Sequence, residues 1–404
     1  MKNRILFGFA LLGALLMTSC ASDDTADINI TDNSDNSVTN NNTTDPGTGG
    51  GGGQTIFLSG TYTTDLTLDA NNTYKINGSL IMASGTTLTI PPCMTIEALA
   101  GGADVYIAIS QGAQIDAQGT SDCPIIFTSD SSAPAAGDWG GLIILGSAPI
   151  NSVSGTATST SEIASLPYGG TNATDNSGTL RYVRVQYSGG SADGQSENNG
   201  VSFYGVGNAT TVQYVQVFEG KDDGFEFFGG TVNADYISVV NAQDDSIDWT
   251  EGYTGTITNA YVKHGADHDK GIEADGFNTD IGNNSSPIYF SAPTVTNLTI
   301  VGLGSGTSSE AIRLRAGTRA TFTNVLLEGY GEGIDMDGNT TDSPTGAGVT
   351  SGETSVTDIT FTDITLKLKN DTGVTFTEAD LISGDGNGTG TDYATWGAGW
   401  TVGN

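Results

Sequence analysis

The feature that most constrains this chain is a repeat between Glu219 and Gly276. Three units read DDGFEF (222–227), DDSIDW (244–249) and DKGIEA (269–274), so their first residues lie 22 and then 25 residues apart. NGVSF (199–203) continues the register upstream, and EAIRL (310–314) and EGIDM (332–336) continue it downstream. A period this short, without a helical pattern, leaves room only for two or three strands joined by Gly, Asn and Asp turns. Each repeat is therefore predicted to be one coil of a parallel β-helix, an all-β solenoid in which each coil buries its apolar residues against its neighbours.

Each unit has a second strand about ten residues upstream. We align 214–217, 236–239 and 261–264 as these strands. Their tyrosines alternate with buried Val or Ile, which predicts an outward tyrosine ladder of Tyr182, Tyr214, Tyr236 and Tyr261. The same alignment places His264 in the column of Val217 and Val239, facing the interior near a corner. Phe203, Phe225, Phe227 and Trp249 are predicted to stack inside the coils.

Charge excludes one class of partner. The chain carries 46 acidic and 13 basic residues, a net charge of −33, together with 58 glycines. Because phosphate backbones require positive charge, nucleic acid is excluded as a partner, whereas cations, basic surfaces and neutral glycans remain.

The N-terminus has the order of a secretion signal. Lys2 and Arg4 precede an apolar run from Ile5 to Met17, which is too short to span a bilayer. The following LMTSC (16–20) resembles a bacterial lipobox, which implies cleavage after residue 19 and lipid on Cys20; a plain signal peptide is the alternative. Ser22, Asp23 and Asp24 resemble an acidic surface-export tag, or are simply a solvated start to the linker.

These features predict three segments. Residues 1–19 are the signal peptide, 20–53 are a lipidated, disordered Asp/Asn/Thr/Gly tether, and 54–404 are the β-helix domain. We expect a monomeric outer-membrane lipoprotein exposed at the cell surface, attached to the membrane through its lipid.

Two further cysteines, Cys93 and Cys123, lie 30 residues apart, which is one to two coils. In an oxidising compartment a disulfide between neighbouring coils is expected. Two free thiols and a metal pair are the alternatives.

Some segments depart from the repeat. Residues 137–146 read as a continuous apolar strand buried on both sides, and residues 151–178 lack periodicity and are expected to form an extruded loop. A second loop is expected between Asp275 and Pro293. Trp396 to Trp400 are expected to cover the last coil.

Three long motifs carry a family resemblance. GDWGGLIILGSAPIN (137–151), SGTLRYVRV (177–185) and DDGFEFFGGTVNA (222–234) resemble a family of uncharacterised bacterial surface lipoproteins of the Bacteroidetes type. The resemblance covers about residues 55–404. It implies a pectin-lyase-like, right-handed β-helix and says little about activity.

The repeat places carboxylates in columns. The residue after each inward Ile or Phe points outward, which stacks Ser202, Glu226, Asp248, Glu273, Arg313 and Asp335. A second acidic column lies at the preceding turns: Asp222, Asp223, Asp244, Asp245, Asp267, Asp269, Glu310 and Glu332. Like charges roughly 5 Å apart repel, and Ca²⁺ accepts such oxygen ligands. We therefore predict calcium binding by Asp223, Glu226, Asp245, Asp248, Asp269 and Glu273; turn capping and a solvated acidic surface are the alternative.

A catalytic site is the competing interpretation. Asp223, Asp244, Asp245, His268 and Arg313 faintly resemble the layout of β-helical polygalacturonases, although RLR (313–315) replaces the expected Arg-x-Lys. A polysaccharide lyase would instead use Ca²⁺ with Lys263 or Lys270 as the base. The function expected from the sequence is a non-catalytic glycan-binding, adhesive or structural module with a polysaccharide or surface protein as partner. The alternative is a lyase or hydrolase acting on an acidic polysaccharide.

Overall fold

The computed structural model describes residues 53–151, 157–191, 197–278, 289–338 and 345–403. The predicted signal peptide, Cys20 and nearly all of the tether lie outside these residues, as does the middle of the loop expected between Asp275 and Pro293. Within the described part of the chain, no helix has the length and apolar character needed to cross a membrane.

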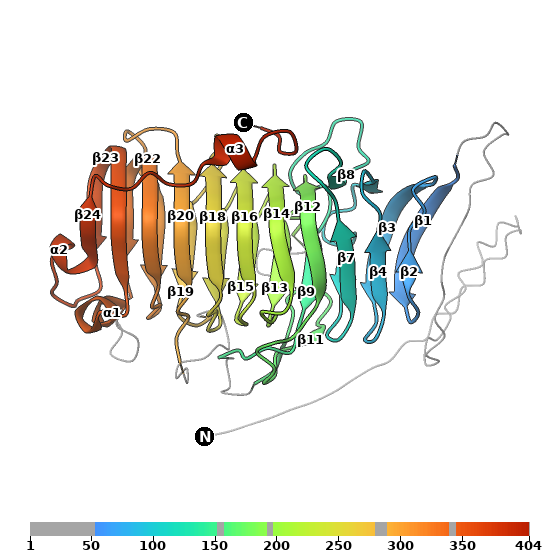
Figure 1. Ribbon diagram of the computed structural model, residues 1–404, viewed down its shortest axis with the longest axis horizontal. Helices are drawn as coiled ribbons and strands as arrows, with labels where there is room; N and C mark the ends of the chain where they lie inside the picture. Colours follow the sequence, from blue (N-terminus) through green and yellow to red (C-terminus); the bar gives the residue numbers. More distant parts are fainter. Residues whose placement is uncertain (1–52, 152–156, 192–196, 279–288, 339–344, 404) are drawn as a thin grey trace, which may run out of the picture. The chain divides into compact units, whose positions relative to one another are not determined.

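Strands dominate the described residues (Figure 1). The strands are β1 (Thr55–Tyr62), β2 (Leu66–Thr67), β3 (Thr73–Met82), β4 (Thr87–Ile90), β5 (Thr95–Ala98), β6 (Ile107–Ile109), β7 (Gln114–Gln118), β8 (Ile125–Ser129), β9 (Leu142–Leu145), β10 (Ser159–Thr160), β11 (Pro167–Tyr168), β12 (Gly178–Gln186), β13 (Val201–Tyr204), β14 (Thr211–Phe218), β15 (Phe225–Phe228), β16 (Asn233–Val240), β17 (Ile247–Thr250), β18 (Thr256–Lys263), β19 (Ile272–Asp275), β20 (Thr294–Val301), β21 (Glu310–Arg315), β22 (Thr321–Met336), β23 (Ser355–Asn370) and β24 (Ile382–Asp385). The helices are α1 (Thr345–Ser351), α2 (Glu378–Leu381) and α3 (Tyr393–Trp396).

The strands form a right-handed parallel β-helix, as the repeat and the resemblance predict. Among the strands of the described residues, twenty-two belong to one sheet system, and only the short β10–β11 hairpin lies outside it. One long ladder runs through β12, β14, β16, β18, β20, β22 and β23, all parallel. A second parallel ladder runs through β9, β13, β15, β17, β19, β21 and β22. Successive repeats of the sequence therefore lie directly beside one another.

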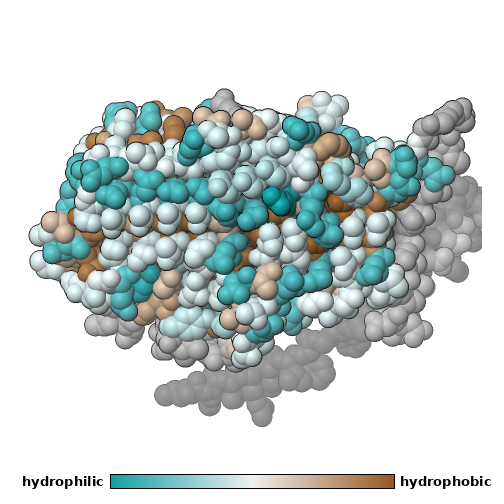
Figure 2. Space-filling model, viewed as in Figure 1, coloured by the Kyte–Doolittle hydropathy of each residue, from teal (hydrophilic) through white to brown (hydrophobic). Residues whose placement is uncertain are grey.

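The interior is a continuous apolar column. Phe203 stacks on Phe227 with ring centroids 5.1 Å apart, and Phe227 stacks on Tyr253 at 4.5 Å. Phe225 and Trp249 are fully buried, so the predicted inward positions are confirmed. All four residues of β9 are buried, as expected for a strand covered on both faces. On the face shown in Figure 2, hydrophobic residues appear only as small patches among hydrophilic and neutral ones, because the alternating side chains point to solvent.

One corner of the coil corrects the predicted tyrosine ladder. Tyr182, Tyr214 and Tyr236 stack with centroids 4.4 Å apart, at left-handed φ angles of 49–57°. The next residue of this corner is Asn259, with φ 56°, and not Tyr261, which pairs with Ser238. Asn297 and Asn324 continue the corner, and each donates its side-chain amide to the preceding Asn, at 2.9 and 2.8 Å. The alignment of 261–264 was therefore wrong by two residues, a slip that preserves the inward–outward alternation and leaves the hydrophobic pattern unchanged.

The same slip affects His264. It follows Lys263, which pairs with Val240, so it does not share the column of Val217 and Val239. Its burial and hydrogen bonding are confirmed: the Tyr330 hydroxyl lies 2.8 Å from Nδ1, and Ser246 Oγ and the Lys270 carbonyl lie 3.2 Å from Nε2. Burial and the neighbouring His268 lower the pKa of His264 to about 3, so it is neutral at physiological pH.

Two segments that join the solenoid from outside differ from expectation. The region expected as an extruded loop carries the antiparallel β10–β11 hairpin, and its Ile163 and Tyr168 pack against Tyr204 and Phe228. The C-terminal residues do not cover the last coil. They return along the helix, so that α3 lies beside β16 and β18 rather than at β24 (Figure 1). Trp400 and Trp396 lie edge-on against the tyrosine stack, with Trp400 5.6 Å from Tyr182 and Trp396 5.6 Å from Tyr236.

The disulfide expectation is confirmed. Cys93 and Cys123 are bonded, with their Cα atoms 4.4 Å apart, and the Cys93 amide also donates to the Cys123 carbonyl at 3.2 Å. The bond joins two adjacent coils near the N-terminal end of the helix.

Candidate functional site

The candidate site is the acidic face, which we define as the outward side chains of β13, β15, β17, β19, β21 and the second half of β22, with the turns before them. The column predicted from the repeat is confirmed by strand pairing. Along the ladder the paired residues are, in order, Ser202, Glu226, Asp248, Glu273, Arg313, Asp335 and Lys369. The regular coil period thus places three acidic residues in successive coils, as the sequence predicts.

The turn before each strand forms the second column. Asp223 Oδ1 accepts the backbone N–H of Asp245 at 2.9 Å, and Asp245 Oδ1 accepts the backbone N–H of Lys270 at 2.7 Å. In the third coil Lys270 therefore occupies the place that Asp223 and Asp245 hold in the first two. Asp269 bonds through its amide to the Asp244 carbonyl, and its side chain is 57% exposed. These carboxylates join one coil to the next.

The two columns bring carboxylate oxygens close enough to share a cation. One such group is formed by Asp223, Glu226 and Asp248, and another by Asp245, Asp248 and Glu273. Within each group, one carboxylate oxygen of every residue lies within 4.8 Å of those of the other two. Asp244, Asp245 and Asp269 form a third such group. All six residues predicted to bind calcium therefore fall in clusters of this kind. An all-oxygen donor set of carboxylates fits Ca²⁺ or Mg²⁺ and not a soft metal.

Burial opposes ionisation of these carboxylates. It raises the pKa values of Asp223, Glu226, Asp245 and Asp248 well above the usual range, and neighbouring carboxylates raise them further. The pKa of Asp222 is raised to about 8 and that of Asp244 to about 6, again mainly by burial. Without a counter-cation, several of these groups hold a proton at neutral pH.

Basic side chains supply counter-charge to only part of the face. Arg315 pairs with Glu273 and, at 2.5 Å, with Asp275; Arg313 pairs with Asp337 at 2.5 Å. Lys369 pairs with Glu332 at 3.3 Å and Asp335 at 3.4 Å.

Lys270 marks the boundary of the neutralised part. It contacts Glu273 at 3.1 Å and reaches Asp245 at 3.8 Å. Burial alone would lower its pKa, but the carboxylates of Asp245 and Glu273 raise it, so Lys270 stays charged. Among the described residues, no Lys, Arg or His lies within ion-pair distance of Asp223, Glu226 or Asp248.

The β10–β11 hairpin lies against part of the acidic face. The Tyr168 hydroxyl donates to Glu251 at 2.6 Å and ties the β10–β11 hairpin to the end of β17. Beneath it lies a cavity of about 50 Å³, lined by Glu162, Glu226, Phe228, Asp248, Thr250, Asp275, Asn278 and Arg315. Asp248 Oδ1 and Thr250 Oγ1 are buried there without a hydrogen-bond partner in the described structure. The volume of this cavity is far below the roughly 300–1,000 Å³ of ordinary small-molecule pockets.

The proposed catalytic residues are only partly brought together. Asp222, Asp223 and Asp244 share one group of oxygens within 4.8 Å, and Asp244 and Asp245 share another. His268 stacks on His264 with ring centroids 4.2 Å apart. Arg313 forms ion pairs with Glu273, Glu310 and Asp337, and with none of the three aspartates.

Sequence reasoning missed four contributors: Arg315 as a counter-charge, Asp275, Thr250 and Tyr168. The first three were detectable, because they lie two residues after Arg313, Glu273 and Asp248 and so face the same side of their strands. Tyr168 carries no such signal, since it lies in a segment without periodicity.

The fold and this face define a class of protein: a right-handed parallel β-helix with a carboxylate-rich outer ladder. The model of the pectate-lyase-like β-helix domain family matches residues 60–401, and the chain belongs to this family. No curated protein matches the chain. The family membership agrees with either a binding or a catalytic function.

Proposed function

We propose that this protein is a surface-exposed outer-membrane lipoprotein whose β-helix serves as a non-catalytic, glycan-binding or adhesive module, with Ca²⁺ held at the acidic face. The lipobox-like LMTSC (16–20), the polar tether and the resemblance to Bacteroidetes-type surface lipoproteins support the location. The elongated ladder of coils supports a binding or adhesive role, because solenoids present extended surfaces.

One observation carries the calcium proposal. Asp223, Glu226 and Asp248 converge within 4.8 Å, in a region where no basic side chain of the described residues pairs with them. Asp248 Oδ1 and Thr250 Oγ1 add buried oxygens that have no partner among the described residues. Ca²⁺ takes six to eight oxygen ligands in flexible geometry, so these carboxylate and hydroxyl oxygens form a suitable partial set.

Three contacts favour the non-catalytic function over a polysaccharide lyase or glycoside hydrolase. Asp223 and Asp245 each accept a hydrogen bond through one carboxylate oxygen from a backbone amide of the next coil. The oxygens of Asp223 and Asp244 approach within 4.8 Å, whereas an inverting hydrolase keeps its two carboxyl groups roughly 6.5–9.5 Å apart. Arg313 is held in an ion pair with Asp337.

Thermal unfolding of the full-length protein tests the calcium site. In excess Ca²⁺ we expect a higher Tm than in chelator, because a ligand bound only to the folded state stabilises it by about 2.7 kcal/mol at 100 times Kd, or roughly 5 °C. Asp248→Asn and Asp245→Asn should remove most of this shift. Asp385→Asn is the matched control, because Asp385 at the end of β24 forms an exposed ion pair with Lys367. This control should leave the Tm shift caused by Ca²⁺ intact. Equal Tm values in Ca²⁺ and chelator would disprove the calcium site.

Membrane attachment is tested separately. Cys20→Ser should move the protein from the membrane fraction to the soluble fraction, since the acylated thiol is the proposed anchor. Protease added to whole cells should degrade the wild-type protein if it is displayed outward. Membrane retention of Cys20→Ser would contradict the lipid anchor, and protection from protease would contradict surface display.

A further inference from the structure

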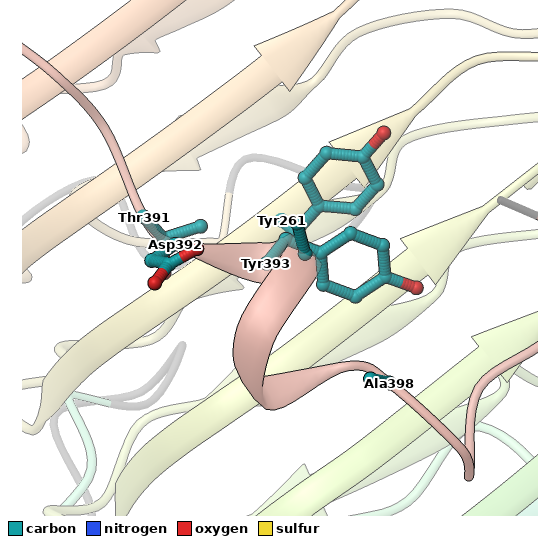
Figure 3. A pocket seen from close by; sticks show the side chains of 6 residues that line it. Tyr261, Thr391, Asp392, Tyr393 and Ala398 are labelled. Carbon is teal, nitrogen blue, oxygen red and sulfur yellow. The ribbon is translucent and has the colours of Figure 1, made fainter.

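An open depression lies where the C-terminal segment crosses β18, away from the acidic face. It has a volume of about 530 Å³, and its lining residues are Tyr261, Thr391, Asp392, Tyr393, Ala394 and Ala398. Figure 3 shows the two tyrosine rings side by side, with Thr391 and Asp392 at one end and Ala398 at the other. The volume falls within the usual range of ligand pockets, roughly 300–1,000 Å³.

The aromatic part of the depression is rigidly held. Tyr393 of α3 stacks on Tyr261 of β18 with ring centroids 3.8 Å apart and planes 8° from parallel. The Tyr393 hydroxyl lies 3.3 Å from Ser238 Oγ and 3.4 Å from Gln216 Nε2. The Gln216 amide also donates to and accepts from the Val402 backbone, at 3.0 and 2.9 Å. The rings are thus fixed before a ligand arrives, which lowers the entropic cost of binding.

The polar groups at the rim have unused hydrogen-bonding capacity. Asp392 precedes α3, yet its exposed carboxylate does not cap the helix as an aspartate at this position usually does. Thr391 Oγ1 accepts the Trp396 indole N–H at 2.8 Å and keeps its own proton to donate. The half-buried Tyr261 makes no hydrogen bond through its hydroxyl to any described residue.

We propose that this depression binds one pyranose unit of a neutral polysaccharide. The C–H face of the sugar packs on the half-buried ring of Tyr261, whose other face is covered by the buried Tyr393, and adjacent sugar hydroxyls donate to the Asp392 carboxylate. The depression is open, so it accepts a unit within a longer chain. This inference rests on the proposed function as a glycan-binding module and assigns the binding to a site distinct from the acidic face.

Charge and shape select this ligand class. The lining contains one carboxylate and no basic residue, on a chain of net charge −33, so a polyuronate is repelled. A cationic side chain is the rival ligand for a tyrosine–aspartate pair. The two rings stack on one another and do not surround a cavity, whereas recognition of an organic cation uses an aromatic cage.

Isothermal titration of the full-length protein tests the site, with cellohexaose, xylohexaose, mannohexaose and maltohexaose as probes. Hexagalacturonate and a lysine-rich peptide are the charged comparisons. We expect at least one neutral hexasaccharide to bind and to alter the fluorescence of Trp396, which lies beside Thr391. Asp392→Ala and Ala398→Arg change exposed residues of the lining and should each weaken binding by about tenfold or more. Thr395→Ala, on the same helix but outside the lining, should change it less than twofold.

The possible outcomes separate this site from the proposed function. Sugar binding that neither lining variant weakens would overturn this site while leaving a glycan-binding protein. No binding of any neutral hexasaccharide would overturn both the site and the glycan-binding function, even if Ca²⁺ still raises the Tm. Binding of the lysine-rich peptide alone, lost in Asp392→Ala, would overturn the proposal in favour of a cation site. Sugar binding that persists in chelator and is lost in the lining variants is the expected result.

Discussion

Two halves of the acidic face occupy equivalent positions of the same ladder but are neutralised differently. In the coils of β15 and β17, four carboxylates cluster, namely Asp223, Glu226, Asp245 and Asp248, and within the described structure their one basic contact is Lys270 at 3.8 Å from Asp245. In the coils of β19, β21 and β22, Arg313, Arg315 and Lys369 pair with the carboxylates directly. Both halves belong to one parallel ladder, so their outward positions are equivalent and the side chains set the balance of charge.

The two halves illustrate two ways to neutralise a stacked column of carboxylates: basic side chains of the chain itself, and protons or cations taken up from solution. A covalently attached cation is always present, so the half that contains Arg313 and Arg315 should depend less on the ions in solution than the other half does. The other half must take up a proton or a dissolved cation, because buried like charges are costly. Its stability should therefore depend on pH and on divalent ions.

The largest expected effect comes from removing a built-in cation. Arg315→Met leaves Glu273 and Asp275 without their closest partner and should lower the free energy of unfolding by about 3 kcal/mol, because an unpaired buried charge remains. Denaturant unfolding measures the change.

Lys367→Met is the matched control for that substitution. Lys367 pairs with Asp385, and both side chains are 40% exposed, so the expected loss is below about 0.5 kcal/mol. Equal losses in the two variants would show that the arginine does not neutralise a buried cluster.

A smaller effect is expected from pH in the half without arginines. Burial raises the pKa of Asp222 to about 8 and that of Asp244 to about 6, above the usual value near 3.9 of an unfolded chain. The folded state therefore binds more protons, and in chelator its stability should rise as pH falls from 8 to 5.5, by about 1–2 kcal/mol.

In excess Ca²⁺ the pH dependence should weaken or reverse, since calcium binds ionised carboxylates. Denaturant midpoints at both pH values, with and without Ca²⁺, provide the comparison. A protein in chelator that loses stability between pH 8 and 5.5 would contradict the raised pKa values.

The smallest expected effect comes from removing one charge. In the wild-type protein the Asn199 side-chain amide donates to Glu226 at 2.6 Å, and Glu226→Gln keeps an oxygen that can accept this hydrogen bond. The substitution also removes the electrostatic repulsion between Glu226 and Asp248. At pH 8 in chelator it should stabilise the protein by about 1 kcal/mol, and at pH 5.5 by less. The substitution should also reduce the rise in Tm caused by Ca²⁺. If Glu226→Gln instead destabilises the protein at pH 8, the Glu226 carboxylate makes a stabilising contact other than the ion pairs described above.

Much of the site was predictable from the repeat. Ser202 to Asp335 were placed in one column from the coil period alone, and their pairing confirms it. Tyr261 was misplaced because a two-residue slip keeps the same face buried, and only the left-handed corner at Asn259 decides the register. The DKGIEA unit already places Lys270 in register with Asp223 and Asp245, but its ion pairs with Asp245 and Glu273 are visible only in the structure.

The sequence by itself determined the parallel β-helix, its inward aromatic stack, the acidic column and the disulfide between adjacent coils, because these depend on contacts between neighbouring repeats. Only the tertiary structure decided that the β10–β11 hairpin packs against the acidic face and that the open depression lies beside α3. Those features depend on single long-range contacts, such as Tyr168 with Glu251, 83 residues apart, and Gln216 with Val402, 186 residues apart. Such contacts occur once and leave no period in the sequence, so side-chain packing in the folded chain alone selects them.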